Sequence, residues 1–171
     1  MLKYRQIFAN DLIIHNQDIY KCYQDNKLIL DEQTIIDLST PEQIVDFIYG
    51  FIQSSDSMVV GIFDQQEQIL FGLVIYDNIR IAETSCAEVH IAVARELWGK
   101  LTRNIFTKIL NESVFDILYC QIPQIAVRAI SMCKHLGFKK TGYVPKALPY
   151  TNSKGECKMY DINFYTYQRG I

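Results

Sequence analysis

Several features that would indicate particular classes of protein are missing from this sequence. The 171 residues carry 17 basic and 19 acidic side chains, for a net charge of −2. A charge this small gives no broad electrostatic attraction to nucleic acid or to an anionic membrane. No apolar run approaches the ~20 residues that span a bilayer, and the N-terminus lacks the long apolar stretch of a secretory signal peptide. We therefore expect a cytoplasmic protein that binds neither nucleic acid nor membrane.

The cysteines are too few and too scattered for a disulfide framework or a zinc site. Their number is odd, and no two form a C-x-x-C pair. We expect reduced thiols and no metal. The chain also lacks G-x-G-x-x-G, G-x-x-x-x-G-K and G-x-S-x-G, so dinucleotide-binding, P-loop and α/β-hydrolase functions have no support. The five cysteines are Cys22, Cys86, Cys120, Cys133 and Cys157.

Linkers and repeats are absent as well. We therefore expect one domain over residues 1–171, whose 49% apolar residues can build a core. Apolar runs and alternation predict strands, and apolar residues at helical spacing predict helices. The predicted strands cover residues 2–8, 58–63, 69–76, 87–93, 115–122, 139–145 and 158–167, with a connection at 148–156 inside the last hairpin. The predicted helices begin at Asp11, Thr40, near Leu97 and at Pro123, and residues 26–38 are ambiguous.

Two predicted helices have contrasting first turns. Thr40 is a typical N-cap, Pro41 suits the first helical position, and Gln43 completes a capping box. The helix near Leu97 has no Ser, Thr, Asp or Asn immediately before it. The backbone N–H groups at its start therefore have no side-chain partner. Such a helix start can bind an anion, although water can satisfy the same groups.

The order of elements is strand, helices, three strands, helix, strand, helix and two strands, which predicts a three-layer α/β or α+β domain. Three stretches then carry a resemblance to a known family. Residues 87–100 run from a strand into a helix, residues 129–143 form a helix that ends in Leu-Gly-Phe before a strand, and residues 155–161 open the last strand. In this order they resemble the GNAT superfamily of N-acetyltransferases, in a divergent form like that of phages and mobile elements. The resemblance implies a central mixed, mostly antiparallel, splayed sheet flanked by helices.

A GNAT resemblance also implies a reaction. It implies direct transfer of an acetyl group from acetyl-CoA, in a ternary complex, to an amino group of a small molecule or a protein, and it is compatible with a homodimer. Backbone N–H groups near Ile91 and Val93 would contact the acetyl and pantetheine parts. The following helix start would hold the pyrophosphate. The implied binding residues there are Trp98, Gly99, Lys100, Leu101, Thr102 and Arg103.

The cofactor loop departs from the family pattern. Only Val93 and Gly99 match the extended motif, and Leu101 and Arg103 replace small residues that let the backbone approach the phosphates. The side chains of Lys100, Thr102 and Arg103 are candidates for phosphate contacts, and a solvated first turn is the alternative. We expect Trp98 to be a core residue rather than a lid over the cofactor.

Candidate catalytic residues lie on the central strand and on the last helix. Glu88 and His90 are two residues apart, so both point to one face of the strand. Glu88 has the family-like position for a general base, and imidazole is the side chain whose charge changes nearest to neutral pH. A polar, partly exposed strand face is the alternative. The family's usual Tyr, which protonates the leaving thiolate, falls at Cys133, which could be a proton donor or a buried structural thiol; Tyr143 is another candidate donor.

Two functions of different classes remain open. The first is an acetyl-CoA-dependent N-acyltransferase for an unidentified amine. The second is a GNAT-like domain that has lost catalysis and serves as a protein-binding or structural subunit, which the altered loop and the missing Tyr favour.

Overall fold

The computed structural model describes residues 2–30, 38, 40–151 and 155–169. Across this part of the chain seven strands form one sheet in the order β1-β2-β3-β4-β5-β7-β6. The strands are β1 (Lys3–Gln6), β2 (Met58–Phe63), β3 (Leu70–Arg80), β4 (Cys86–Val93), β5 (Ile117–Pro123), β6 (Lys139–Thr151) and β7 (Cys157–Gln168). The helices are α1 (Ala9–Ile14), α2 (Asn16–Leu30), α3 (Pro41–Gln53), α4 (Lys100–Glu112) and α5 (Val127–His135), and a short 3-10 turn covers Arg95–Leu97.

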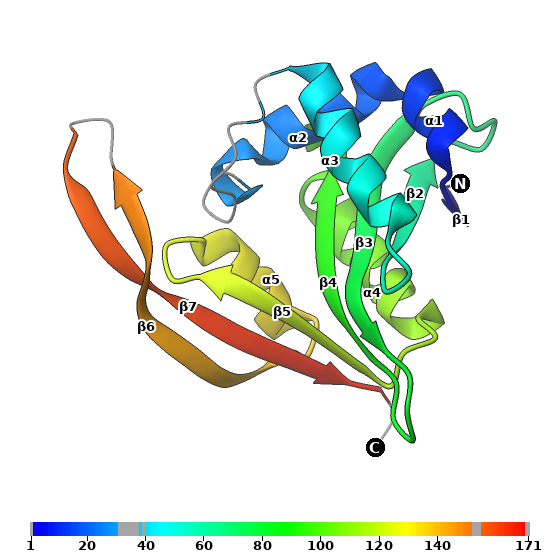
Figure 1. Ribbon diagram of the computed structural model, residues 1–171. Helices are drawn as coiled ribbons and strands as arrows, with labels where there is room; N and C mark the ends of the chain where they lie inside the picture. The colour runs from blue at the N-terminus through cyan, green and yellow to red at the C-terminus, as the bar shows by residue number, and fades with distance from the viewer. Residues whose placement is uncertain (1, 31–37, 39, 152–154, 170–171) are drawn as a thin grey trace.

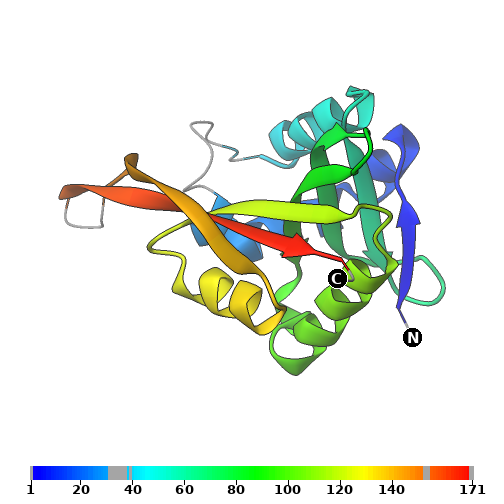
Figure 2. The same cartoon turned by 90° about the horizontal axis from the view of Figure 1, so that it is seen from below.

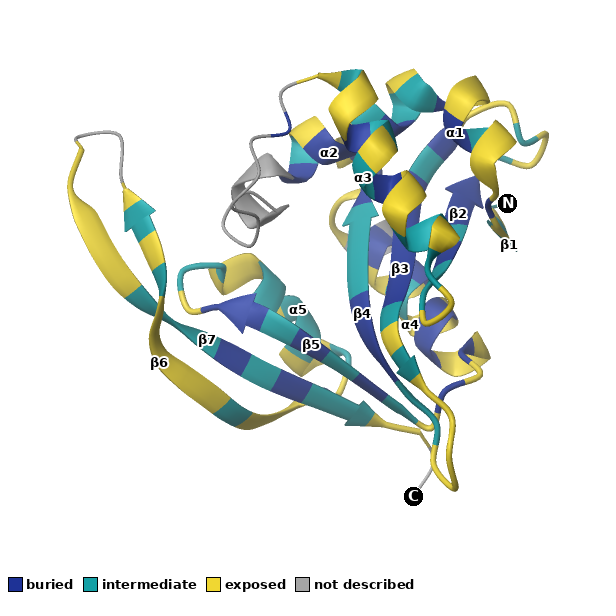
Figure 3. Ribbon diagram, in the orientation of Figure 1, coloured by how far each residue is buried: buried dark blue, intermediate teal, exposed yellow. Residues whose placement is uncertain are grey.

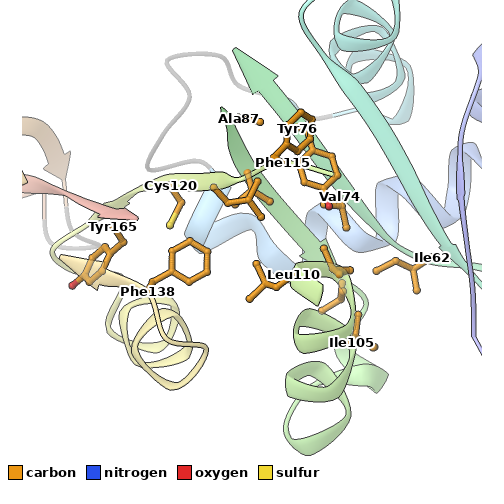
Figure 4. Close-up of a cluster of buried hydrophobic side chains, with 14 of the residues drawn as sticks. Ile62, Val74, Tyr76, Ala87, Ile105, Leu110, Phe115, Cys120, Phe138 and Tyr165 are labelled. Atoms are coloured by element: carbon orange, nitrogen blue, oxygen red, sulfur yellow. The ribbon is translucent and has the colours of Figure 1, made fainter. Parts of the chain in front are cut away.

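The helices cover both faces of the sheet (Figures 1 and 2). On one face α1, α2 and α3 pack on β2 and β3 around a buried cluster that includes Leu12, Ile19 and Ile44. On the other face α4 and α5 pack around a second cluster, in which Figure 4 shows Ile105 and Leu110 of α4. The two clusters confirm a sheet between two helical layers. No helix in the described part of the chain is long and apolar enough to cross a membrane.

The capping box at the start of α3 is confirmed. The backbone N–H of Gln43 donates to Thr40 Oγ1 at 3.3 Å, and the backbone N–H of Thr40 donates to Gln43 Oε1 at 3.1 Å. Pro41 is the first residue of the helix. The box therefore fixes the place where the chain enters α3, the helix that covers β2 and β3.

The sheet is mixed, mostly antiparallel and splayed, as the resemblance implied. Within the described strands, β4 and β5 form its parallel pair, and their ladder joins residues 86–88 to residues 117–119. Beyond that ladder β4 continues to Val93 and β5 to Pro123, but the two strands no longer pair with each other. Figure 1 shows the two strands diverging from this seam. The sheet thus opens between β4 and β5, close to the ends of both strands.

Two predicted boundaries were wrong because strand pairing overrides local sequence signals. Pro123 does not open a helix: it ends β5, opposite Ile162 of β7, and α5 begins at Val127. The last hairpin is also longer than predicted, because Leu148 to Thr151 pair with β7 although the residues 148–156 had been expected to form a connection.

A bulge explains the irregular hairpin. The register shifts between Val144 and Leu148, where Lys146 has a positive φ of 48°. The Asp161 carboxylate accepts a hydrogen bond from the backbone N–H of Lys146 at 3.0 Å. Asp161 therefore fixes the hairpin. Figure 3 shows that most of β6 is exposed, in contrast to the buried middle of β3.

Candidate functional site

The open edge of β4 is made of backbone groups. The N–H of Ala94 donates to the Phe71 carbonyl of β3 at 2.7 Å. Because alternate residues of an antiparallel ladder point to opposite sides, the even-numbered residues of β4 turn their backbone groups toward β3. Ile91 and Val93 therefore turn theirs toward β5, where the sheet is open. The two predicted N–H donors lie along this open edge.

The carbonyl of Val93 on the same edge is already occupied. It accepts hydrogen bonds from Asn26 Nδ2 at 2.9 Å and from Trp98 Nε1 at 3.1 Å. The first bond joins the edge to α2, and the second joins it to the loop before α4. The open edge and the start of α4 are thereby held next to each other.

Helix α4 starts without a side-chain cap, one turn later than predicted. Leu97 belongs to the 3-10 turn, and Gly99 is the N-cap, with φ of 96° and ψ of −133° and no capping side chain. The first helical bond runs from Arg103 N to Gly99 O at 3.3 Å. The backbone N–H groups of helical residues 100–102 therefore have no carbonyl acceptor within α4. No acidic side chain lies in the first turn of the helix. This helix start is suited to an anion.

The side chains of the loop only partly follow the predictions. Thr102 is buried, and its hydroxyl donates to the Leu97 carbonyl, so it is turned away from any phosphate at the helix start. Arg103 is exposed and remains a candidate. The side chains of Lys100 and Leu101 lie outside the described part of the structure. Trp98 is not a core residue: it is 37% exposed, and the Arg95 guanidinium carbon lies 5.9 Å from its ring.

Glu88 and His90 share the face of β4 that is turned toward α2 and α3. Glu88 Oε1 lies 3.7 Å from His90 Nε2. The other carboxylate oxygen accepts hydrogen bonds from Asn78 Nδ2 and Gln121 Nε2, both at 3.3 Å. Glu88 is buried, with 5% exposure, so the alternative of a polar, partly exposed strand face does not apply to this residue. A buried, anchored carboxylate beside an imidazole is suited to accepting a proton.

A cavity adjoins this pair. Its volume is about 310 Å³, and it lies between α2, α3 and the faces of β3 and β4. Twelve residues of the described part of the chain line it, and among these His90 is the one with a basic side chain and none is acidic. The lining residues are Ile19, Cys22, Tyr23, Leu38, Ile44, Phe47, Ile48, Leu73, Ile75, His90, Ile91 and Ala92.

Cys133 lies in contact with a second thiol. Its Sγ is 3.7 Å from Sγ of Cys120 on β5, so α5 and β5 meet at this pair. The hydrogen bond with Cys133, together with burial, raises the pKa of Cys120, and the same bond lowers the pKa of Cys133. Cys133 is half-buried rather than fully enclosed. Of the two thiols it is the better source of a thiolate or a proton.

Tyr143 is not brought to the site. It lies on β6, and β7 and β5 separate that strand from β4 in the sheet. Its side chain is 58% exposed, with Lys140 Nζ 5.0 Å from the ring. Tyr143 is therefore a surface residue of the hairpin.

Sequence reasoning missed the amides that hold the site together. Asn26 fell in the ambiguous stretch, although it continues the helical spacing of Ile19 and Cys22 and is a polar residue within an apolar stripe. That spacing could have identified it. Asn78 and Gln121 had no such signal, because they reach Glu88 from neighbouring strands of the sheet.

No protein-family model matches the sequence, and no curated protein sequence matches it. Solved structures match the fold. The chain has the GNAT fold, with the parallel pair opening beside an uncapped helix. Spermidine N-acetyltransferase from Vibrio cholerae, in complex with CoA and spermine, is 20% identical, with a TM-score of 0.72 over 98% of this chain and 95% of that one. A chimera of the Vibrio cholerae enzyme SpeG with hSSAT is 17% identical, with a TM-score of 0.70 and the same coverage. Identities this low establish the fold alone.

Proposed function

We propose that this chain is an acetyl-CoA-dependent N-acetyltransferase that acts on an amine. Two sets of backbone N–H donors carry this proposal: one at the uncapped start of α4 and one along the open edge of β4. The hydrogen bond from the Trp98 indole to the Val93 carbonyl holds the two sets next to each other. An extended ligand with a phosphate at one end and a carbonyl at the other matches both sets. The similar Vibrio cholerae structure contains CoA, which agrees with this proposal.

The residues present fit acetyl-CoA. The N–H groups at the start of α4 would hold the pyrophosphate, with Arg103 exposed beside them. The cofactor loop needs Gly99 because of its positive φ, and a Cβ built there would meet nothing within 4 Å, so the space over the loop is open. The N–H groups of Ile91 and Val93 would pair with pantetheine and acetyl oxygens. When bound, acetyl-CoA supplies an activated acetyl thioester.

The chain's own groups provide the rest of the reaction. The Glu88–His90 pair accepts the proton of the acceptor ammonium, so that the nitrogen lone pair is free to attack the thioester carbonyl. A backbone N–H of the open edge stabilises the negative charge that develops on the carbonyl oxygen. As the carbon–sulfur bond breaks, the nitrogen releases its second proton to solvent and the departing sulfur gains one. Cys133 on α5 is the candidate donor to the sulfur, and its thiolate then takes up a proton from solvent.

Calorimetric titration of acetyl-CoA tests the proposal. We expect micromolar binding to the native chain and loss of binding in Gly99→Glu, which places a negative charge at the helix start. Gly155→Glu is a matched control, because Gly155 also has a positive φ and open space around its Cβ position. Binding that survives Gly99→Glu would mean that the helix start is not the phosphate site.

A second candidate function is a binding or structural subunit without catalysis. It is favoured by the inward turn of Thr102, which removes one phosphate contact, and by a thiol at position 133 in place of a phenol. The same titration separates the two functions: no binding at millimolar acetyl-CoA would reject the enzyme in favour of this alternative.

We propose that residues 1–171 act as one domain in the cytoplasm, where a reducing environment suits five free thiols. We also propose a homodimer. The exposed apolar side chains Phe8, Ile13 and Ile14, which are 59%, 72% and 72% exposed, are available to form its interface. Light scattering of the native chain and of Ile13→Asp tests this part.

A further inference from the structure

The cavity beside Glu88 and His90 reaches from the domain core to the open edge of β4. Its inner wall is formed by buried core residues such as Ile19, Ile44 and Leu73, which are at most 4% exposed. Its outer end lies at His90, Ile91 and Ala92, which are all half-buried. Ile91 also lies on the edge proposed to meet the acetyl group. A molecule in this cavity would therefore have one end in the core and the other at the reacting groups.

The described part of the cavity wall is almost free of charged side chains. Among the described residues that line it, none is Asp, Glu, Lys or Arg. Burial raises the pKa of the Cys22 thiol to about 12, so this group stays neutral in the wall. Moving a charged group from water into such an environment without a partner is costly. A chain with several ammonium groups, such as a polyamine, would find no carboxylate partner among these described lining residues.

One end of the cavity does provide a place for a single positive charge. His90 is at its edge, and the Glu88 carboxylate lies 3.7 Å from the imidazole. The cavity thus combines an apolar interior with one polar, proton-accepting end. Its volume of about 310 Å³ is at the small end of the range of ligand sites, roughly 300–1,000 Å³. These dimensions suit one ring or one short branched chain.

The packing around the cavity favours a ligand site over a packing defect. Protein interiors are close-packed, and an empty apolar void destabilises the fold in proportion to its size. Side chains from α2, α3, β3 and β4 nevertheless leave this space open on the face that carries Glu88 and His90. An apolar ligand in contact with that pair accounts for both its position and its lining.

We infer that the acceptor is a monoamine with an apolar body, an arylalkylamine or a branched alkylamine, whose body fills the cavity and whose nitrogen lies at His90 and Glu88. This inference rests on the proposed function. It assigns to this chain an acceptor class different from the polyamine bound in the similar Vibrio cholerae structure.

Release of free CoA thiol with a panel of amines tests the inference. The panel compares 2-phenylethylamine and 3-methylbutylamine with spermidine, at saturating acetyl-CoA. We expect kcat/KM for the two apolar amines to exceed that for spermidine by roughly tenfold or more, the scale on which apolar pockets discriminate.

Two variants connect the preference to the cavity. Ala92→Leu places extra volume at the cavity's outer end, so KM for 2-phenylethylamine should rise about tenfold while acetyl-CoA affinity stays unchanged. Ala147→Leu, on exposed β6, is its control. Phe47→Ala removes a half-buried lining side chain, and it should shift the preference toward the larger 2-(2-naphthyl)ethylamine, which provides a second measurement if Ala92→Leu does not fold.

The outcomes separate the two proposals. If spermidine is preferred, if all amines react equally, or if acetyl-CoA binds but no apolar amine reacts, the inference is wrong while the proposed function stands. If acetyl-CoA does not bind and no amine reacts, both are wrong. A preference for apolar amines that neither Ala92→Leu nor Phe47→Ala alters would place their site elsewhere and overturn the assignment of this cavity.

Discussion

The start of α4 gives a prediction whose size can be worked out from the backbone. Gly99 has φ of 96° and ψ of −133°, whereas Gly50 lies in α3 with helical geometry. A Cβ added at either position would meet nothing within 4 Å. Any difference between Gly99→Ala and Gly50→Ala therefore comes from the backbone and not from packing.

The two substitutions should change the free energy of unfolding in opposite directions. At Gly99 an alanine is forced into a conformation that is nearly restricted to glycine, which costs about 1–3 kcal/mol. At Gly50 an alanine in an exposed helix gains about 0.5–1 kcal/mol. The two variants should then differ by about 1.5–4 kcal/mol in the free energy of unfolding. For a chain of this size each kcal/mol moves Tm by roughly 2–4 °C.

Urea unfolding of the native chain and both variants, with acetyl-CoA titration of each, measures this difference. We expect Gly99→Ala to be less stable than the native chain and to bind acetyl-CoA more weakly, because relaxation of the strain moves the helix start. Gly50→Ala should be more stable and bind normally. If the two variants have equal stability, the positive φ at Gly99 is not required, and the argument that this loop is built around a glycine is refuted.

Three further predictions concern other groups. Glu88→Gln should lower kcat/KM about 10²–10⁴-fold without changing acetyl-CoA affinity in calorimetry; an unchanged rate would exclude Glu88 as the base. The hydrogen bonds from Arg5 lower the pKa of Asp11, so this pair stabilises the fold above the ordinary carboxyl range and loses its effect as acid is added below about pH 4. Asp11→Asn should therefore cost about 1–2 kcal/mol at pH 7 and flatten the acid limb of the unfolding curve, and parallel limbs would contradict this. Because Cys120 lowers the pKa of Cys133, peptide mass spectrometry should find faster iodoacetamide labelling at Cys133 than at Cys120, and slower labelling of Cys133 in Cys120→Ala; equal rates would contradict the pairing.

The sequence predicted the features that depend on neighbours along the chain. The capping box of Thr40 and Gln43 is made of residues three apart, and its geometry follows from helix chemistry alone. The shared face of Glu88 and His90 follows from strand periodicity in the same way. The order of elements and the GNAT fold were predicted for this reason, since each motif could be interpreted locally.

Features that depend on partners far along the chain were not predicted. Pro123 resembles a helix start, yet its place is decided by β7. Trp98 is apolar and aromatic, which favours a core position, but its indole N–H is held by the Val93 carbonyl at the open edge, so the ring stays partly exposed. The cavity could not be predicted at all, because its wall is assembled from two helices and two strands.

The short ladder between β4 and β5 has a consequence for the cohesion of the whole molecule. Two antiparallel halves, β1 to β4 and β5 with β7 and β6, meet in the sheet through residues 86–88 and 117–119. A ligand that lies along the edge of β4 facing β5 would supply hydrogen-bond partners that the short β4–β5 ladder does not. Binding energy and cohesion of the halves are then linked. Amide hydrogens of β5 and α5 should therefore exchange faster than those of β3 in the free protein, and slow toward the same rate once the ligand closes the seam.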